Sequence, residues 1–335
     1  MFILGIETSC DETSSAVVED GVKLLSNVVA SQVDVHSLYG GVVPEIASRA
    51  HAESISAVVA EAIEKSGVKL CDIGAVAVTY APGLIGALLA GLSFAKGLSY
   101  ALGVPLVPVH HIRGHVAANY LTRPSPKPPF FALVVSGGHT SLIKVEDYAV
   151  YSTIGSTRDD AAGEAFDKAA RVLGLPYPGG AAMDTLAEKG DPGAVGFPSP
   201  RVEGHEFDFS FSGLKTSLIN YVANNGGEQC LDQKTKADIA ASFTFTLVKA
   251  ITDRLERLFI KKGKLPLVLA GGVAANSHLR KSVTMLCEKH GAELFMPPIS
   301  LCGDNAAMIA SQGFFELLAG NISQKNQNAY ASLGV

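Results

Sequence analysis

Apolar and polar residues form two strand–turn–strand patterns that recur along the chain. The first pattern spans residues 2–21, with a polar turn at 7–14 between two apolar runs. The second begins after the proline-rich stretch 124–129 and spans residues 130–145, with a polar turn at 136–140. Each pattern predicts a β-hairpin. The second part of the chain therefore repeats the start of the first.

Two further elements repeat in the same order. Residues 75–109 and 265–296 each show an apolar strand, a glycine turn, a helix and a second strand, which predicts a β-α-β unit. Before each unit lies a stretch with helical apolar spacing, at 44–67 and at 239–263. Hairpins combined with helical crossovers predict an α/β fold of two lobes, each with a mixed sheet, and a ligand site in the cleft between them.

Composition narrows the class of protein. The chain has 335 residues, of which 47% are hydrophobic and 18% charged, which is typical of a globular enzyme and excludes disorder. Its net charge of −5 argues against a general nucleic-acid-binding surface, so any RNA contact must be local or assisted by a partner. Five cysteines without a close pair favour a reducing cytoplasm.

Neither export nor membrane insertion is expected. Glu7 and Asp11 interrupt the N-terminus before an apolar run reaches the length of a signal peptide. The most apolar stretch, residues 84–103, contains Lys96 and several glycines. This pattern favours a buried helix over a bilayer span.

A histidine pair is the first candidate for chemistry. His111 and His115 are four positions apart, which places both imidazoles on one face of a helix. Asp304 is expected to come from the opposite lobe and to complete a site of two histidines and one carboxylate, which suits iron and tolerates zinc. The alternative is a pair of ordinary surface or core histidines. The repeated units favour the metal site.

Two glycine turns are the second candidate. Residues 136–140 and 271–276 place backbone N–H groups at a hairpin tip and at a strand-to-helix junction, where they can surround phosphate. Glycines that serve only as tight-turn residues are the alternative. Asp167 and Asp184 could accept hydrogen bonds from ribose or substrate hydroxyl groups, although helix capping explains Asp184 equally well. Asp11 lies in the first hairpin turn and, taken alone, is predicted to be a surface acid.

Eight ordered motifs resemble those of the tRNA threonylcarbamoyladenosine-forming transferases of the bacterial TsaD type, once labelled O-sialoglycoprotein endopeptidases. The resemblance runs from Met1 to about Ala310. The motifs are GIETSCDET, GGVVPEIASRAH, HHIRGH, VSGGHT, DDAAGEAFDKAARVLGLPYPGG, FDFSFSGLKT, AGGVAAN and CGDNAAM.

The resemblance implies a two-lobed, internally duplicated actin-like ATPase fold (ASKHA, RNase H-like), with an N-terminal lobe of residues 1–115 plus 305–335 and a C-terminal lobe of 116–304. It implies one divalent metal ion, Fe²⁺ before Zn²⁺, held by His111, His115 and Asp304. The implied contacts to the substrate threonylcarbamoyl-AMP come from Val134, Val135, Ser136, Gly137, Gly138, Asp167, Gly180, Asp184 and Asn276.

The implied reaction moves the threonylcarbamoyl group from threonylcarbamoyl-AMP to the exocyclic amine of the adenosine 3′ to the anticodon, in tRNAs that read codons beginning with adenine. Asp11 is the provisional aid to proton removal. The expected partners are tRNA, a paralogous TsaB-type subunit and a small TsaE-type ATPase in the cytoplasm, with a homodimer as another assembly and no membrane.

Two features depart from the family pattern. Many relatives have glutamate where this chain has Arg113, which is expected to put a cation near the metal ligands. The C-terminal tail, residues 326–335, lacks tryptophan, which puts its contacts to tRNA in doubt.

Three rival functions remain to be weighed. A metalloprotease would need a glutamate beside the first histidine, where the chain has Ile112. A small-molecule kinase of the same fold would use the glycine turns for ATP. A catalytically dead scaffold would not need all three proposed metal ligands.

Overall fold

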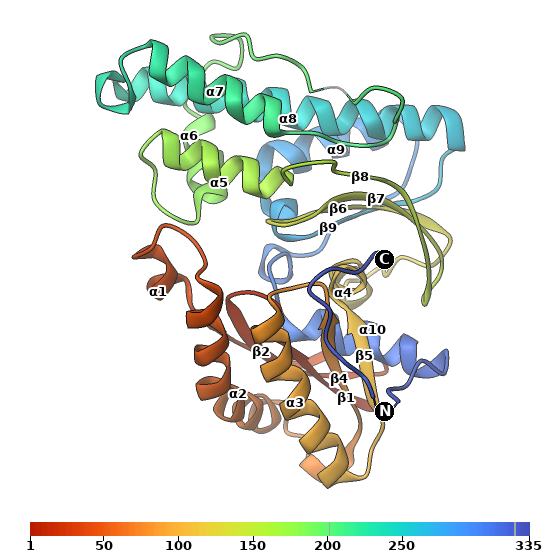
Figure 1. Cartoon of the computed structure of the whole chain (residues 1–335). Coiled ribbons are helices and arrows are strands. Elements are labelled where there is room, and N and C mark those ends of the chain that lie inside the picture. The colour runs from red at the N-terminus through yellow and green to blue at the C-terminus, as the bar shows by residue number, and fades with distance from the viewer. Residues whose placement is uncertain (201, 325) are drawn as a thin grey trace. The chain divides into compact units, whose positions relative to one another are not determined.

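The computed structural model describes residues 1–200, 202–324 and 326–335, and divides them into two compact units (Figure 1). The first unit comprises residues 1–128, 145–151 and 297–335, and the second comprises residues 129–144 and 152–296. The first unit thus also contains residues 116–128, 145–151 and 297–304, which were expected in the C-terminal lobe of residues 116–304. The boundaries of functional domains stay a prediction.

The first unit is built on a sheet of five strands in the order β3-β2-β1-β4-β5. β1 pairs antiparallel with β2, which pairs antiparallel with β3, whereas β1, β4 and β5 are parallel. The strands are β1 (Phe2–Glu7), β2 (Glu12–Glu19), β3 (Lys23–Ser31), β4 (Ile73–Ala81) and β5 (Leu106–His110). The helices are α1 (Val33–Ser37), α2 (Pro44–Ser66), α3 (Ile85–Leu102), α4 (His111–Ala117) and α10 (Ala306–Leu318).

Both faces of this sheet are covered, which explains why its central strands are almost wholly apolar. On one face, Ile3, Ala77 and Val109 pack in a cluster with Ile309 of α10. On the other face, the cluster includes Leu4, Val78 and Leu88, and α2 contributes to it as well. Because α10 lies against β1 and α4, the segment just before α10 is held at the end of the sheet where α4 begins.

The second unit has its own five-stranded sheet, in the order β10-β9-β6-β7-β8. β9 is parallel to both β6 and β10. The strands are β6 (Phe130–Val135), β7 (Thr140–Asp147), β8 (Val150–Ser156), β9 (Leu267–Ala270) and β10 (Leu294–Phe295). The helices are α5 (Ala162–Val172), α6 (Gly179–Ala187), α7 (Ser212–Asn224), α8 (Gln233–Lys262) and α9 (Ser277–His290). Short 3₁₀ helices span Leu70–Asp72 (η1), Ala118–Leu121 (η2), Glu228–Cys230 (η3), Gly272–Ala275 (η4) and Ile299–Leu301 (η5).

The repeats predicted from the sequence are confirmed within each unit. The first hairpin is β1–β2, with Phe2 opposite Glu19. The two β-α-β units are β4-α3-β5 and β9-α9-β10, each with parallel strands. The helix expected from residue 239 begins earlier, because Asp232 caps it by accepting a hydrogen bond of 2.7 Å from the N–H of Thr235.

One helix among the described residues, α3, is long and apolar enough to cross a membrane by length and composition. Its mean hydropathy is 1.4 over 18 residues, and a third of this window is buried. Leu88, Leu92 and Ala95 of α3 pack into the core of the first unit. A helix that packs on a sheet in this way passes the same test, so the finding is weak evidence for a membrane span.

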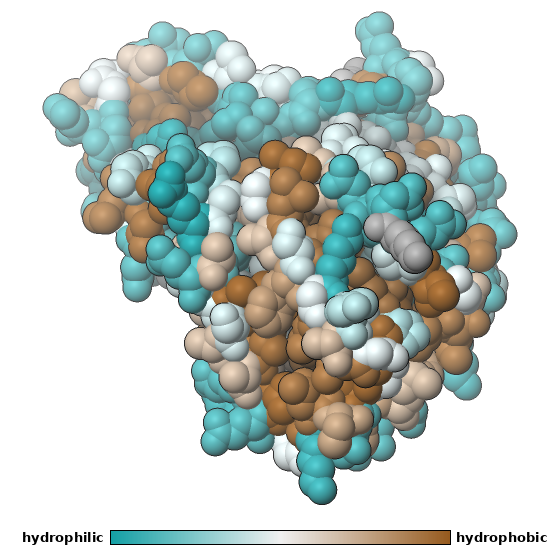
Figure 2. Space-filling model, turned by 60° about the horizontal axis from the view of Figure 1, so that its bottom comes forward, coloured by the Kyte–Doolittle hydropathy of each residue, from teal (hydrophilic) through white to brown (hydrophobic). Residues whose placement is uncertain are grey.

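Apolar side chains also reach the surface of the first unit. Figure 2 shows brown, apolar areas interrupted by polar residues on the face that lies at the bottom of Figure 1. Exposed apolar or aromatic side chains of this unit include Leu38 (81% exposed), Tyr39, Ile85 and Tyr100. Single exposed apolar side chains are normal on a protein surface, whereas a large contiguous apolar area is typical of a contact with another chain.

We predict that Gly5→Ala destabilises the fold, because α10 lies directly on β1 at this point. A Cβ on Gly5 would lie 2.3 Å from the backbone oxygen of Ala306 and 2.8 Å from the nitrogen of Ala310. Forcing these backbones apart should cost about 1–3 kcal/mol of unfolding free energy, measured by urea denaturation. The control is Gly97→Ala on α3, where no atom lies within 4 Å. There alanine should stabilise the helix by up to about 1 kcal/mol. Equal stabilities of the two variants would contradict the packing argument.

Candidate metal and nucleotide sites

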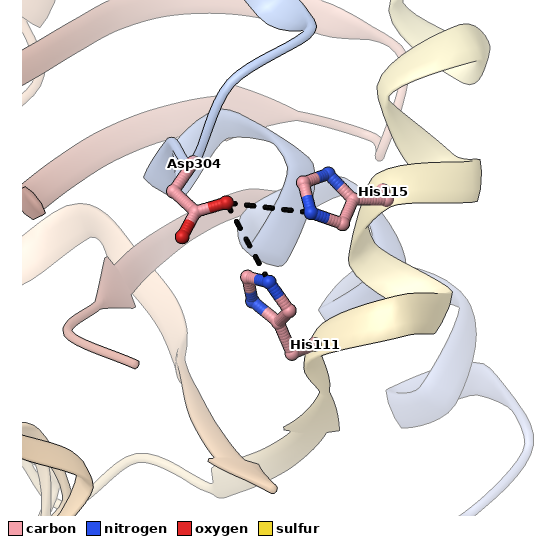
Figure 3. A group of neighbouring side chains, drawn as sticks. All are labelled: His111, His115 and Asp304. Atoms are coloured by element: carbon pink, nitrogen blue, oxygen red, sulfur yellow. Dashed lines mark ion pairs between the residues drawn. The ribbon is translucent and has the colours of Figure 1, made fainter. Parts of the chain in front are cut away.

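The two histidines predicted to share a metal ion lie on one face of α4. α4 begins where β5 ends, and the His110 side chain caps it by accepting a hydrogen bond of 3.2 Å from the N–H of Ile112. The four-residue spacing brings the rings of His111 and His115 to a centroid distance of 4.5 Å (Figure 3). Both rings point toward Asp304.

Asp304 immediately precedes α10, whose first turn is capped by Asn305. Its Oδ1 lies 3.5 Å from Nε2 of His111 and 3.3 Å from Nε2 of His115. One ligand atom from each of the three residues lies within 4.8 Å of the others. Asp304 belongs to the same unit as the histidines, so its expected origin in the opposite lobe is corrected. The reason is the packing of α10 against the first sheet.

The surroundings of these side chains fit a metal ion. The His115 side chain is 1% exposed, its Nδ1 has no hydrogen-bond partner among the described residues, and its Nε2 faces the Asp304 carboxylate at 3.3 Å. Leaving a buried polar nitrogen without a hydrogen bond is costly, and coordination of a cation would remove that cost. The Asp304 side chain keeps 19% of its surface exposed, which leaves one side of the group open.

Glu7 lies behind the histidines and contacts His111. The sequence alone did not indicate this role. Its Oε2 lies 3.0 Å from Nδ1 of His111 and accepts a hydrogen bond of 2.7 Å from the Thr79 hydroxyl. Its Oε1 accepts one of 2.5 Å from the N–H of Ser9. A carboxylate behind a histidine fixes the ring for metal binding. An acidic residue at the end of a buried strand was the signal that could have revealed it.

The surroundings shift the pKa values of the two histidines in opposite directions. Burial lowers the pKa of His111, but the carboxylates of Asp304 and Glu7 outweigh burial and raise this pKa to about 9. Burial, reinforced by His111, lowers the pKa of His115. Burial raises the pKa of Glu7, but His111 outweighs it and holds this pKa below its ordinary value. Without a metal, His111 therefore carries the proton, and His115 is neutral and ready to coordinate.

The first hairpin turn adds two more acids near this group. Asp11, which the sequence alone suggested to be a surface acid, is only 7% exposed. Burial raises the pKa of its neighbour Glu12 to about 10, and the carboxylates of Asp304 and Asp11 add to this effect. Glu12 is consequently protonated at neutral pH. The role of Asp11 in proton removal stays a prediction.

The glycine turns predicted to bind a nucleotide lie together in the second unit. Val134 and Val135 end β6 and are fully buried, so only their backbone can face a ligand. A Cβ on Gly271 would lie 2.4 Å from the backbone oxygen of Val135, which shows that the loops after β6 and β9 touch. Because these strands are parallel neighbours, both loops follow the same edge of the sheet.

The turn itself leaves its backbone accessible. The Ser136 N–H donates a hydrogen bond of 2.8 Å to the carbonyl of His139, which closes the turn. The N-terminal end of α5 docks on it, since the Gly163 N–H donates to the Ser136 carbonyl at 3.2 Å. A Cβ on Gly137 or Gly138 would meet no atom within 4 Å. These glycines therefore face open space.

Three polar residues surround these loops. Asp167 accepts a hydrogen bond of 3.1 Å from the N–H of Gly180. Asp184 accepts one of 2.9 Å from the N–H of Ser277 and lies 2.8 Å from Nδ1 of His278, which favours its capping of α9. Asn276 caps the same helix through Oδ1, and its buried Nδ2 has no hydrogen-bond partner among the described residues. This amide is therefore a donor that a ligand could use.

Arg113 does not face the metal ligands as expected. Its guanidinium pairs with Glu316 at 3.0 Å, lies 4.8 Å from the ring centroid of Tyr151 and donates to the carbonyl of Ala149 at 3.3 Å. The Glu316 side chain is only 4% exposed, so the pair is largely buried. The cation is neutralised on another side of α4.

The architecture is that of the actin-like ATPase class of α/β proteins. HypF from T. kodakarensis is similar with a TM-score of 0.64 and 14% identity, over 97% of this chain and 48% of that chain. The Acidaminococcus fermentans (R)-2-hydroxyglutaryl-CoA dehydratase component A gives 0.55 with 16% identity over 95% and 99%. A ROK hexokinase from Thermus thermophilus gives 0.54 with 14% identity over 96% and 99%. At these identities the likeness concerns the fold alone.

Within this class, the sequence defines the family. Residues 23–311 match the family model described as tRNA N6-adenosine threonylcarbamoyltransferase. A protein of that name from Clostridium perfringens (strain SM101) is 51% identical over 331 residues, 99% of this chain and 97% of the relative. One from Caldicellulosiruptor bescii is 52% identical over 329 residues, 98% and 97%. The chain belongs to the tRNA N6-adenosine threonylcarbamoyltransferase family.

We predict that His111→Ala abolishes tight binding of a divalent metal and keeps the fold. Loss of a residue behind metal ligands already costs about 10–100-fold in affinity, so loss of a ligand should cost at least about a hundredfold. Zinc affinity, measured by competition with a chromophoric chelator, tests this. His205→Ala, which changes an exposed histidine of the second unit, is the control. Equal affinity of both variants would show that the metal binds elsewhere.

We also predict that metal affinity falls with decreasing pH. The proton on His111 competes with the metal, and its pKa of about 9 means that this proton must leave at every lower pH. Affinity should weaken by up to about tenfold for each pH unit between pH 8 and 6. Zinc titrations at several pH values, with calorimetry in buffers of different ionisation enthalpy, would detect the released proton. An affinity independent of pH would disprove the assignment.

Proposed function

We propose that the chain transfers the threonylcarbamoyl group from threonylcarbamoyl-AMP to the exocyclic amine of the adenosine 3′ to the anticodon, in tRNAs reading codons that begin with adenine. The observation that carries this proposal is the 51% identity to a named transferase over 99% of the chain. The grouping of His111, His115 and Asp304 supports it independently, since a binding scaffold would not need three converging ligands.

The proposed cofactor is one divalent metal ion held by His111, His115 and Asp304. Two histidines and one carboxylate with open positions suit Fe²⁺ first and Zn²⁺ second. When bound, the ion would act as a Lewis acid toward oxygen atoms of the substrate. Glu7 would hold His111 in the correct orientation for coordination through Nε2, because it engages Nδ1.

The proposed donor site is the group of loops in the second unit. Backbone N–H groups of Ser136, Gly137 and Gly138 would bind the phosphate of the AMP moiety, because open space lies over the two glycines. Gly180 and Gly272 leave similar space, and the Asn276 amide supplies a buried donor. Asp167 and Asp184 would accept hydrogen bonds from hydroxyl groups in addition to their structural ones. Val134 and Val135 would contribute backbone atoms only.

The proposed reaction forms one bond and breaks one bond at the carbamoyl carbon. The adenosine amine attacks the carbamoyl carbon, a C–N bond forms, the bond from that carbon to the phosphate oxygen breaks, and AMP leaves. The amine loses a proton, and Asp11 is the proposed acceptor. Catalysis then depends on positioning of two substrates and on stabilisation of the leaving phosphate.

Partners are part of the proposal. A paralogous TsaB-type subunit and a TsaE-type ATPase in the cytoplasm would assist, and a homodimer is the other assembly to test. The exposed apolar side chains of the first unit support a protein partner. A net charge of −5 supports assistance in holding tRNA.

The rival functions fit the geometry less well. For a metalloprotease, the position after His111 should be an acidic base, and Ile112 there is buried in the core. A small-molecule kinase is supported by the fold that the chain shares with a hexokinase. A shared fold does not imply a shared reaction. The kinase would consume ATP without RNA.

The deciding experiment incubates the purified chain, with its partner subunits, with threonylcarbamoyl-AMP and unmodified tRNA. Mass spectrometry of the digested RNA should reveal threonylcarbamoyladenosine. We predict that Asp304→Ala lowers the rate by at least about a hundredfold, because the proposed metal loses its only carboxylate ligand. His205→Ala should act like the wild type. If no modified nucleoside forms while ATP is consumed, the kinase becomes the better hypothesis.

A further inference from the structure

The proposed metal ligands are shared between two helices that lie far apart in the sequence. His111 and His115 belong to α4, whereas Asp304 immediately precedes α10. The distances of 3.5 and 3.3 Å between the histidine Nε2 atoms and the Asp304 Oδ1 therefore depend on how α10 is placed against α4. A site that is loose by about 1 Å is no longer a good site. Contacts that fix α10 on α4 consequently affect the ligands, even where they lie away from them.

Arg113 makes such a contact from the opposite side of α4. With 3.6 residues per turn, it lies about 160° around the helix axis from each of the two histidines. Its Nη1 donates a hydrogen bond of 3.0 Å to Oε1 of Glu316 on α10. It also donates to the carbonyl of Ala149 at 3.3 Å, and its guanidinium lies over the ring of Tyr151. One side chain thus joins α4 to α10 and to the segment 145–151 of the same unit.

The Glu316 carboxylate is held by other donors besides Arg113. The Gln312 side chain donates to its Oε1 at 2.9 Å, and the Asn321 side chain donates to its Oε2 at 2.6 Å. Gln312 is fully buried and accepts a hydrogen bond of 3.0 Å from the Tyr151 hydroxyl. A buried pair whose oxygen atoms are satisfied in this way is held in one geometry, unlike an ion pair on the surface.

This contact and the ligand Asp304 lie at opposite ends of α10. Glu316 is in the last turn, about 15 Å along the helix axis from the first residue of α10. Nearer the first end, α10 packs on α4 through Ile309, whose Cδ1 would lie 2.7 Å from a Cβ on Gly114. Two contacts separated along one helix fix its direction as well as its position. Without the ion pair, α10 would be free to pivot about the Ile309 contact.

We propose that Arg113 is a positioning residue for the metal ligands, because its pair with Glu316 fixes the direction of α10 against α4. This inference rests on the metal site of the proposed function. Loosening α10 would leave the free ligands less ordered, so part of the binding free energy of a metal would go into ordering them. Residues that orient metal ligands from behind contribute about 10–100-fold to affinity, and a residue acting through a helix should lie at the lower end.

The test compares metal affinity with stability in the full chain. Arg113→Met keeps a long unbranched side chain and removes its charge and hydrogen bonds. We expect Zn²⁺ affinity, measured by competition with a chromophoric chelator, to fall about tenfold. The visible absorption of Co²⁺ bound in place of Zn²⁺ reports the ligand geometry and should change as well. Arg113→Lys keeps the cation and should retain most of the Zn²⁺ affinity.

Arg254→Met is the matched control. Arg254 is a buried arginine of the second unit that donates to the carbonyl groups of Asp208 at 2.7 Å and Pro200 at 3.0 Å, and it lies over the ring of Phe209. Its loss should lower stability to urea without changing the Zn²⁺ affinity or the Co²⁺ spectrum. A tenfold loss of Zn²⁺ affinity in both methionine variants would mean that general destabilisation is the cause, and would refute the positioning role.

Glu316→Gln tests the same pair from α10 and covers the case in which Arg113→Met does not fold. Glutamine keeps the volume and one acceptor oxygen but removes the charge, so Zn²⁺ affinity should again fall about tenfold. The double variant should lose no more than the weaker single variant, because both changes break one interaction. Unchanged affinity in Glu316→Gln would refute the positioning role alone. Equal Zn²⁺ affinities of the wild type and His111→Ala would refute the metal site on which it rests.

Discussion

The contact of α10 with β1 and α4 is the constraint on which the metal site depends. The backbone of α10 lies so close to β1 that only glycine fits at position 5. The N–H of Ala306 donates a hydrogen bond of 2.8 Å to the Ser14 hydroxyl, and a Cβ on Gly114 of α4 would lie 2.7 Å from the Cδ1 of Ile309. Two residues before Ala306, Asp304 is thereby fixed opposite two histidines that lie far from it in sequence.

The charges gathered at this point explain why a cation belongs there. Glu7 and Asp304 flank His111, and the buried Asp11 and protonated Glu12 lie in the adjoining turn. Buried carboxylates are costly unless a cation or hydrogen bonds compensate them. In the free chain, protonated His111 supplies that cation. A divalent ion would replace its proton and supply more positive charge, so metal binding and the charge balance of the first unit are linked.

The predictable parts of the structure are those set by local pattern. The hairpins, the β-α-β units and the shared face of His111 and His115 follow from periodicities within about twenty residues. The sequence could not place Asp304, because that depends on which sheet α10 packs against. It missed Glu7, whose role depends on a partner 104 positions away. It misjudged Arg113, because its partners Glu316 and Tyr151 come from distant segments.

The same construction underlies both candidate sites. β5 runs directly into α4, and β9 runs into η4 and α9, so that each parallel strand delivers a polar segment at its carboxyl end. The first segment ends in imidazoles suited to a metal, and the second in backbone amides and Asn276 suited to a phosphorylated ligand. The two strands are not counterparts in the repeat, because β5 closes its β-α-β unit whereas β9 opens the other one, so the two sites use different strand ends of the duplicated plan. Asp184 combines two roles: it caps α9, and it lies beside the loops where hydroxyl groups of a nucleotide would bind.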